Sequence, residues 1–244
     1  METTGISCFS VFANCLLVKS AHPDIMSLGH CGTNAMPLEP RRWVIPDDPT
    51  VVPRHAAVKA TFGQPNITRW YNANENNNTR LVFRAWGGMC TTSYAISHSG
   101  AQKAINYLGL RNVTKAIDNG ISDLCHDAKY NFKCVSTWPS LFGPHRPAGS
   151  ESKGSDIQKI GFSQKIRANA VSMYLTFSTR MNLDRLLRGE TKFASQFAEH
   201  TGTDMGIDEI SRATGHPEEV AIQEKWLNMT KEEMVKISWR GGHW

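Results

Sequence analysis

The sequence lacks several features that would assign it at once to a common class of protein. It has no run of basic residues, although Lys and Arg outnumber Asp and Glu by 27 to 22, so the charge footprint of a nucleic-acid-binding protein is missing. It has no apolar run of the roughly 20 residues that a membrane-spanning helix needs. Its six cysteines form no CxxC pair, which argues against a structural zinc site. These absences exclude nucleic acid as the expected partner and leave membrane association and oligomeric state open.

The composition indicates a loop-rich α/β protein. With 244 residues, of which 40% are apolar, the chain is long enough to bury a sizeable core in one large domain or two small ones. Charged residues make up 20% of the chain, below the roughly 25% usual for soluble domains, while 19 Gly and 11 Pro are present. This balance excludes disordered, coiled-coil and collagen-like architectures.

Two features bear on the cellular compartment. Residues 5–18 form an apolar stretch after an N-terminus without positive charge, so residues 1–23 are either a signal-peptide core or a buried element left at the start of a shortened chain. The sequence also has four Asn-x-Thr sequons, which are glycosylation acceptors in proteins of the secretory pathway. We therefore expect the ER or Golgi lumen, or secretion. The sequons are at Asn66, Asn77, Asn112 and Asn228.

Hydrophobic periodicity and turn residues predict an alternation of strands and helices up to about residue 160. Strands are expected at residues 25–28, 81–86, 91–96 and 132–137, with a short one near 43–45, and helices at 100–108, capped by Ser99, and at 117–126. Beyond residue 157 the patterns at 166–187 and 218–238 are helical, the second with a capping box from Thr230 to Glu233. The expected organisation is an α/β domain over 24–160 and a helical extension over 161–244.

Three places combine polar groups with special backbone. His30 lies in a glycine-flanked loop after the first strand, where α/β folds place binding groups. Asp118 begins a helix, where a carboxylate complements the helix dipole without needing any function. The loop over 143–157 offers His145 and Arg146 between prolines, a set that suits a metal diphosphate but equally suits an ordinary turn.

Several segments of the chain, taken in their order, match the pattern of a known protein family. Together they resemble the fungal branch of glycosyltransferase family 25, the relatives of the lipopolysaccharide and collagen galactosyltransferases. The similarity runs from about Asp24 to Asp156. The segments are IMSLGHCGTN at 25–34, VIPDDPTV at 44–51, CTTSYAIS at 90–97, GAQK at 100–103, DLC at 123–125, WPSLF at 138–142, HRPAG at 145–149 and SDI at 155–157, with a fainter match at 182–191.

The resemblance implies part of a GT-A-like nucleotide-sugar domain, a mixed sheet with helices on both faces. It implies transfer of a hexose, often galactose, from a UDP-sugar to an acceptor hydroxyl on a glycan or protein, with inversion and a divalent Mn²⁺ or Mg²⁺ ion. Asp118 would be the general base, because inversion requires a carboxylate opposite the leaving UDP, and His145 would be a ligand of the metal or of the diphosphate. The expected donor- and substrate-binding residues are His30, Thr91, Tyr94, Trp138, Arg146 and Ser155, with Arg146 on the phosphates. Tyr94 and Trp138 would either offer sugar-stacking faces or belong to the core.

The chain also departs from the family. The acidic metal motif of the family precedes the segment matched by residues 29–32, and here only 28 residues come before it, without an acidic pair. Asp47 and Asp48 align with a different element. The chain is therefore expected to be a transferase that lacks much of the donor-binding half, either active or inactive through truncation. The alternative is a non-catalytic secretory protein that binds a glycan or a partner protein.

The resemblance to secretory enzymes also predicts that four cysteines are oxidised. They are the four that lie between Asp24 and Asp156, the range of the similarity, and the expected pair is Cys125 with Cys134, because so short a loop closes at small entropic cost. The four cysteines are Cys31, Cys90, Cys125 and Cys134.

Overall fold

The structure, a computed structural model, is mixed α/β in the residues that it describes. These are residues 22–53, 78–111, 115–150, 165–172, 175–197, 204–206, 209, 214–222, 224–230 and 232–234. The N-terminal apolar segment lies outside them, as do Ser155 and the sequons at Asn66, Asn77 and Asn112, whereas Asn228 is described and exposed. The expected mixed sheet with a few helices is confirmed in this part of the chain.

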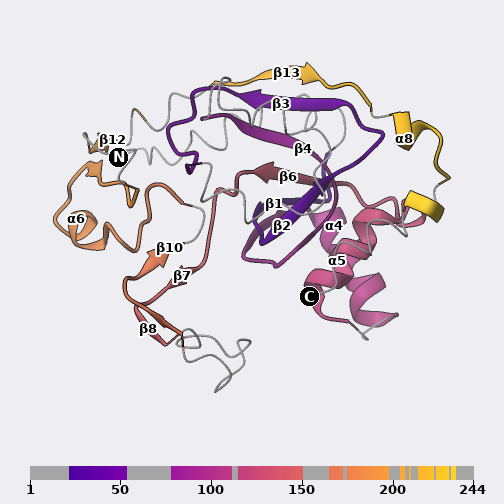
Figure 1. The fold of residues 1–244 in the computed structure, drawn as a ribbon. Helices are drawn as coiled ribbons and strands as arrows, with labels where there is room; N and C mark the ends of the chain where they lie inside the picture. Colours follow the sequence, from indigo (N-terminus) through magenta and orange to yellow (C-terminus); the bar gives the residue numbers. More distant parts are fainter. Residues whose placement is uncertain are drawn as a thin grey trace.

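A seven-stranded sheet organises the molecule (Figure 1). Its strand order is β13-β3-β4-β6-β1-β5, and β2 pairs with β4. β1 and β6 run parallel, while the other neighbours in this sheet are antiparallel. The strands are β1 (Ile25–Gly29), β2 (Gly32–Ala35), β3 (Arg41–Ile45), β4 (Arg80–Met89), β5 (Ser93–Ile96), β6 (Cys134–Trp138) and β13 (His216–Glu219).

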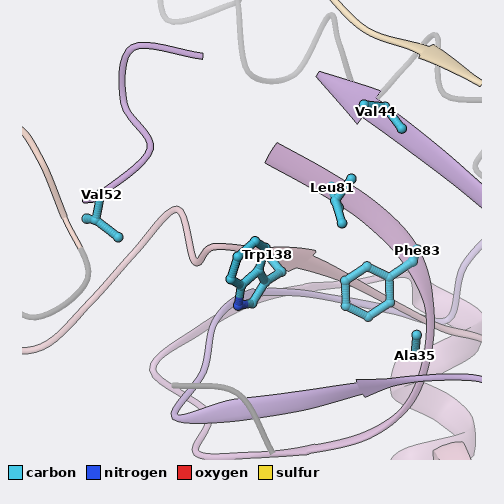
Figure 2. Close-up of a cluster of buried hydrophobic side chains, with 6 residues drawn as sticks. All are labelled: Ala35, Val44, Val52, Leu81, Phe83 and Trp138. Carbon is cyan, nitrogen blue, oxygen red and sulfur yellow. The ribbon is translucent and has the colours of Figure 1, made fainter. Parts of the chain in front are cut away.

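The core lies on both faces of the central strands, because successive side chains of a strand point to opposite faces. Leu81 and Phe83 of β4 belong to the cluster in Figure 2, which also contains Trp138. Val82, between them in sequence, belongs to a different cluster together with Val135 of β6. Every residue of β6 is buried, including the polar Ser136 and Thr137, so both faces of this strand are covered.

Two helical segments follow β5, and α5 packs against β4 (Figure 1). α4 (His98–Ala104) continues as the π-helical η3 (Ile105–Leu110), and α5 spans Ile117–His126, as the sequence predicts. The predicted cap at Ser99 is wrong: Ser97 has extended backbone and accepts a hydrogen bond from the Gly100 N–H at 3.1 Å. The Ser99 hydroxyl lies 3.4 Å from the Asp24 carboxylate instead.

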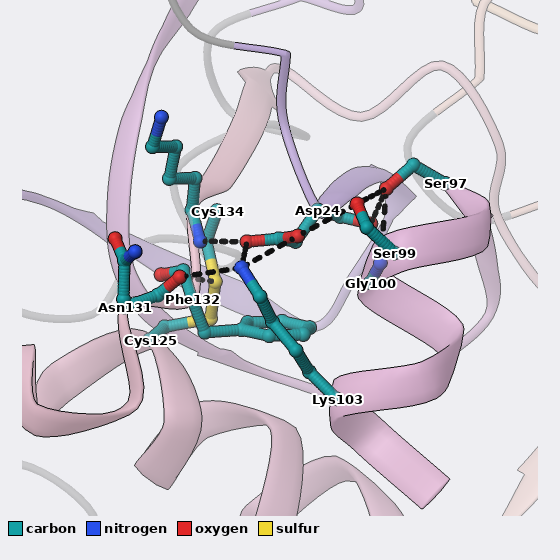
Figure 3. Close-up of polar contacts among 10 residues, drawn as sticks. Asp24, Ser97, Ser99, Gly100, Lys103, Cys125, Asn131, Phe132 and Cys134 are labelled. Atoms are coloured by element: carbon teal, nitrogen blue, oxygen red, sulfur yellow. Dashed lines mark hydrogen bonds and ion pairs between the residues drawn. A yellow bond between two sulfur atoms is a disulfide. The ribbon is translucent and has the colours of Figure 1, made fainter.

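Asp24 connects α4 to the starts of β1 and β6, as Figure 3 shows. Its buried carboxylate accepts hydrogen bonds from the Lys103 ammonium at 2.8 and 3.0 Å and from the Lys133 N–H at 2.8 Å. A side chain at position 100 would collide with the Asp24 carbonyl, so α4 approaches the sheet closely only because Gly100 has none.

A second buried carboxylate anchors the connection after β3. Asp48 forms an ion pair with Arg80, at 2.5 Å from its Nε, and accepts hydrogen bonds from the N–H and hydroxyl of Thr50. Burial raises the pKa of Asp48, but the Arg80 charge and these hydrogen bonds outweigh it, so the pKa lies below its usual value. The Asp48 carboxylate is thus held in an internal ion pair. This agrees with the expectation that Asp47 and Asp48 are not the acidic metal motif of the family.

The expected helix over 166–187 is wrong. The structure instead has strands β9 (Ile166–Arg167) and β10 (Val171–Ser172), followed by α6 (Leu183–Leu187). Short polar side chains in this stretch bond the backbone of other segments: the buried Thr176 hydroxyl lies 3.0 Å from the carbonyls of Thr50 and Val51. Such contacts compete with helix formation, although the apolar spacing favours it.

The rest of the C-terminal part is also built from short pieces. Two-residue strands pair antiparallel as β7 with β10, β8 with β9 and β11 with β12. The expected capping box is confirmed, because the Thr230 N–H donates to Glu233 at 2.8 Å and the Glu233 N–H donates to the Thr230 hydroxyl at 3.3 Å. Of the expected helix over 218–238, the described residues include the one-turn α8 and the helical residues 232–234, whereas 218–219 belong to strand β13. The bounds are β7 (His145–Arg146), β8 (Gly149–Ser150), β11 (Lys192–Phe193), β12 (Met205–Gly206) and α8 (Glu224–Leu227).

No helix in the described ranges is long and apolar enough to cross a membrane.

Candidate functional site

A pocket lies between the sheet and α5, and it brings together three of the predicted site residues. Thr91, Tyr94 and Asp118 all line it: Thr91 lies just before β5, Tyr94 is on β5 and Asp118 is on α5. Its empty space, including the open mouth, is about 440 Å³. Most of the remaining lining is small or apolar and comes from β1, β4, β6 and α5: Ile25, Ser27, Thr33, Ala85, Gly87, Gly88, Cys90, Ile121, Cys125, Cys134 and Val135.

Asp118 is the one charged residue of this lining, and the backbone orients it. It is the second residue of α5, where the partial positive charge of the helix N-terminus favours a carboxylate. Its Oδ1 accepts the Asn119 N–H at 2.8 Å and its Oδ2 accepts the Cys90 N–H at 3.2 Å. A carboxylate oxygen has two lone pairs, so each oxygen can accept one more hydrogen bond from a ligand hydroxyl.

Two disulfides border the pocket. The structure joins Cys125 to Cys134 and Cys31 to Cys90, so the predicted oxidation of all four cysteines and the predicted pair are confirmed. The first links α5 to β6, and the second links the turn before β2 to the residue after β4. The pocket is therefore cross-linked on two sides to the sheet.

Glycine at position 87 lets α5 come close to β4. Gly87 has a φ of 118°, and a Cβ there would collide with the rings and hydroxyls of His126 and Ser122. The His126 ring lies 2.6 Å from the Ser122 carbonyl through Nδ1 and packs at a tilt against Trp86, with centroids 5.2 Å apart. Burial lowers the pKa of His126, so the imidazole is neutral at neutral pH. The sequence analysis ended the strand at residue 86, whereas β4 continues through Gly87 to Met89, so this role was missed.

His30, which was expected to bind substrate, is a structural residue. It is 2% exposed, and its Nε2 lies 2.7 Å from the Thr137 carbonyl. Burial lowers its pKa, and the hydrogen bond to Thr137 offsets this only in part. His30 is absent from the pocket lining; its Nε2 bonds backbone, and its Nδ1 is buried without a hydrogen-bond partner in the described part of the chain.

Trp138 also lies in the core and not in the pocket. It is 4% exposed and packs with Leu81 and Phe83, so its ring offers no free face to a sugar (Figure 2). The expectation of a stacking role for Trp138 is therefore wrong. Tyr94, by contrast, is 46% exposed at the pocket and keeps an open face.

His145 and Arg146 lie on β7, which pairs with β10 and does not line the pocket. The His145 Nδ1 lies 3.0 Å from the Ser172 hydroxyl, which also bonds Ser178. Within the described ranges, no group of three or more His, Cys, Asp or Glu residues is placed to hold a metal ion. The described residues thus do not fit the divalent ion that the family resemblance implies.

No protein-family model, curated protein or solved structure shows a significant match to the chain.

Proposed function

We propose that the chain is a hexosyltransferase, of the kind that family 25 resemblance implies, that binds the acceptor sugar in the pocket beside Asp118. One observation carries the proposal: Thr91, Tyr94 and Asp118, singled out separately in the sequence, line the same pocket. The donor would be a UDP-sugar, with galactose as the expected hexose.

The chemistry of the lining suits a pyranose ring. A sugar has polar hydroxyls at its edge and an apolar face of C–H groups. Asp118 accepts hydrogen bonds from hydroxyls in addition to its two backbone bonds. Ile25, Ala85 and Val135 provide an apolar wall, and the exposed ring of Tyr94 stands at the mouth.

In the proposed reaction Asp118 is the general base. It takes the proton of the acceptor hydroxyl while that oxygen attacks the anomeric carbon of the donor. The bond from this carbon to the UDP oxygen breaks, and UDP leaves with the electron pair. The N–H groups of Cys90 and Asn119 hold the carboxylate in one orientation, which lowers the cost of reaching the attack geometry.

A second candidate is a non-catalytic protein that binds a glycan in the same pocket. The observation that favours it is the position of His145 and Arg146 on β7, outside the lining, because these residues were expected to hold the metal and the diphosphate. The two candidates share sugar binding and differ in transfer.

Binding is tested first, with methyl β-D-galactopyranoside and lactose as probes in saturation-transfer NMR. Asp118→Asn is expected to weaken binding about tenfold or more, because it removes a charge-assisted hydrogen bond. The matched control is Asp123→Asn on the same helix: Asp123 pairs with Lys115 at 2.6 Å and does not line the pocket, so binding should not change. Equal loss in both variants, or no binding of either probe, would overturn the proposal.

Transfer is tested separately, by release of UDP from UDP-galactose in the presence of a panel of glycosides. A general base contributes about 10² to 10⁴ in rate, so Asp118→Asn should reduce kcat by about that factor. Sugar binding without UDP release by the natural chain would select the second candidate.

A further inference from the structure

The two disulfides that border the pocket differ in their surroundings. Cys125 and Cys134 are 7% and 2% exposed and lie within the core between α5 and β6. Cys31 and Cys90 are half-buried and lie in turns beside the pocket. A dissolved thiol therefore has access to the Cys31–Cys90 bond and much less to the other.

Cys90 has an unusual backbone conformation. Its φ of 62° is in the left-handed region, which costs a residue with a Cβ roughly 1 kcal/mol or more and which Asn and Asp adopt more readily than Cys. Such a conformation persists only where the surrounding structure enforces it. The disulfide to Cys31, just before β2, is the covalent link that holds Cys90 in place.

The conformation of Cys90 has a consequence for the pocket. It directs the Cys90 N–H at Oδ2 of Asp118, 3.2 Å away, although the two residues are on different elements. The Asn119 N–H bonds only Oδ1, so the Cys90 N–H fixes the rotation of the carboxylate. φ at Cys90 is the rotation about the bond from its nitrogen to its Cα. If the residues after Cys90 stay in place, a change of φ turns the peptide plane between residues 89 and 90, and with it this N–H, away from Asp118.

We propose that the Cys31–Cys90 disulfide is a thiol-sensitive latch that positions Asp118 in the pocket. Its effect on sugar affinity rests on the proposed function, whereas its effect on the Cys90 backbone does not. Cys90 is in this sense a positioning residue, acting through Asp118.

The opening step is a thiol–disulfide exchange with a dithiol as reductant. One thiolate of the dithiol attacks a sulfur of the pair and forms a mixed disulfide, and the other cysteine leaves as a thiolate. The second thiol of the dithiol then displaces the first cysteine. Two electrons and two protons pass to Cys31 and Cys90, which become thiols, and the dithiol becomes a cyclic disulfide. Cys90 is then free to relax to extended backbone.

The test uses the whole chain and increasing concentrations of dithiothreitol, followed by alkylation and mass spectrometry. Cys31 and Cys90 are expected to be alkylated at a lower concentration than Cys125 and Cys134. At that concentration, amide exchange measured by NMR should accelerate at least tenfold at Cys90, with no change at Val135 in β6. Alkylation of Cys125 and Cys134 at a lower dithiothreitol concentration than Cys31 and Cys90 would overturn the latch. So would an unchanged exchange rate of the Cys90 amide in protein that is alkylated at Cys31 and Cys90.

Two variants test whether the backbone conformation is what matters. Cys31→Ser with Cys90→Ser removes the bond and should weaken binding of methyl β-D-galactopyranoside about tenfold, for lack of one hydrogen bond on a carboxylate. Cys31→Ser with Cys90→Asn also lacks the bond, but Asn adopts the left-handed region, so it should regain part of the affinity and of the Cys90 amide protection. Equal behaviour of the two variants would contradict the proposal.

The failure of the proposed function gives a different result. If the oxidised natural chain binds no sugar probe, the pocket is not a sugar site, and the latch is still judged by amide exchange at Cys90. If the oxidised chain binds and the Cys90 amide does not respond to reduction, the latch is wrong and the sugar site stands.

Discussion

The region from β1 to β6 and the region from β7 to β12 keep their order by different means. In the first, long strands bury whole side chains such as Leu81 and Val82, which are fully buried. In the second, the strands are only two residues long, and buried polar side chains bond the backbone between them, as when Asn182 bonds the backbone of Ser178 and Ala194. The first kind of order depends on periodicity and burial, and the second on individual polar contacts.

The two regions should differ most in how much free energy of unfolding is lost when a side chain is truncated to Ala. Phe83→Ala removes a ring that is 2% exposed between β3 and β6, and large-to-small changes of this kind cost about 3–5 kcal/mol. Leu187→Ala in α6 removes a side chain that is 76% exposed and should change the free energy of unfolding by less than about 0.5 kcal/mol. Urea denaturation followed by tryptophan fluorescence measures both. Similar losses would show that the C-terminal region is as tightly packed as the sheet.

Removal of the buried disulfide is the next largest effect. Cys125→Ser with Cys134→Ser frees a loop closed over 9 positions, and the chain-entropy model gives a cost of about 3 kcal/mol. Because this bond joins α5 to β6, we expect the sheet to unfold at a lower urea concentration, measured as the midpoint of its denaturation curve. Hydrogen exchange in residues 183–193 should not respond if the two regions open separately, and a matching response there would show that they unfold as one unit.

Much of the first region could be predicted from the sequence, and little of the second. α5 is found at the predicted residues 117–126, because its apolar spacing and its boundaries are local signals. The pairing of β13 with β3, which aligns His216 with Val44, joins segments far apart in the chain, and no local pattern encodes it. In the candidate site, Asp118 was predicted from the sequence. Its hydrogen bond with the Cys90 N–H was not, because it depends on how the fold brings the end of β4 to α5.

A pH dependence of stability is expected from the first region, through His30. Burial holds its folded pKa below the value near 6.5 of an exposed histidine, so the unfolded chain binds the proton more readily. The stability that the neutral ring contributes is fully present above that value and is lost as pH falls below it, by at most about 1.4 kcal/mol per pH unit for one group. Urea midpoints at pH 7.5 and pH 5.5 measure the slope.

His30→Gln serves as the control, because an amide retains a donor toward the Thr137 carbonyl and does not titrate in this range. Its slope should be smaller than that of the natural chain, with His126 accounting for part of the remainder because burial lowers its pKa too. An unchanged slope in the variant would remove His30 as the source.

The smallest effect concerns a backbone position in the second region. Gly189 follows the last turn of α6 with a φ of 73°, and its N–H donates to the Leu186 carbonyl at 3.0 Å, which is how helices commonly end in glycine. A Cβ there meets no atom within 4 Å, so Gly189→Ala tests the backbone conformation and not a steric clash. It should destabilise α6 by about 1 kcal/mol, and Gly189→Asn by less, because Asn tolerates the left-handed region. If α6 opens independently of the sheet, hydrogen exchange at Leu186 will accelerate in Gly189→Ala while the urea midpoint of the sheet stays the same. A shift of that midpoint would instead mean that contacts such as Thr176 with Thr50 couple the two regions into one cooperative unit.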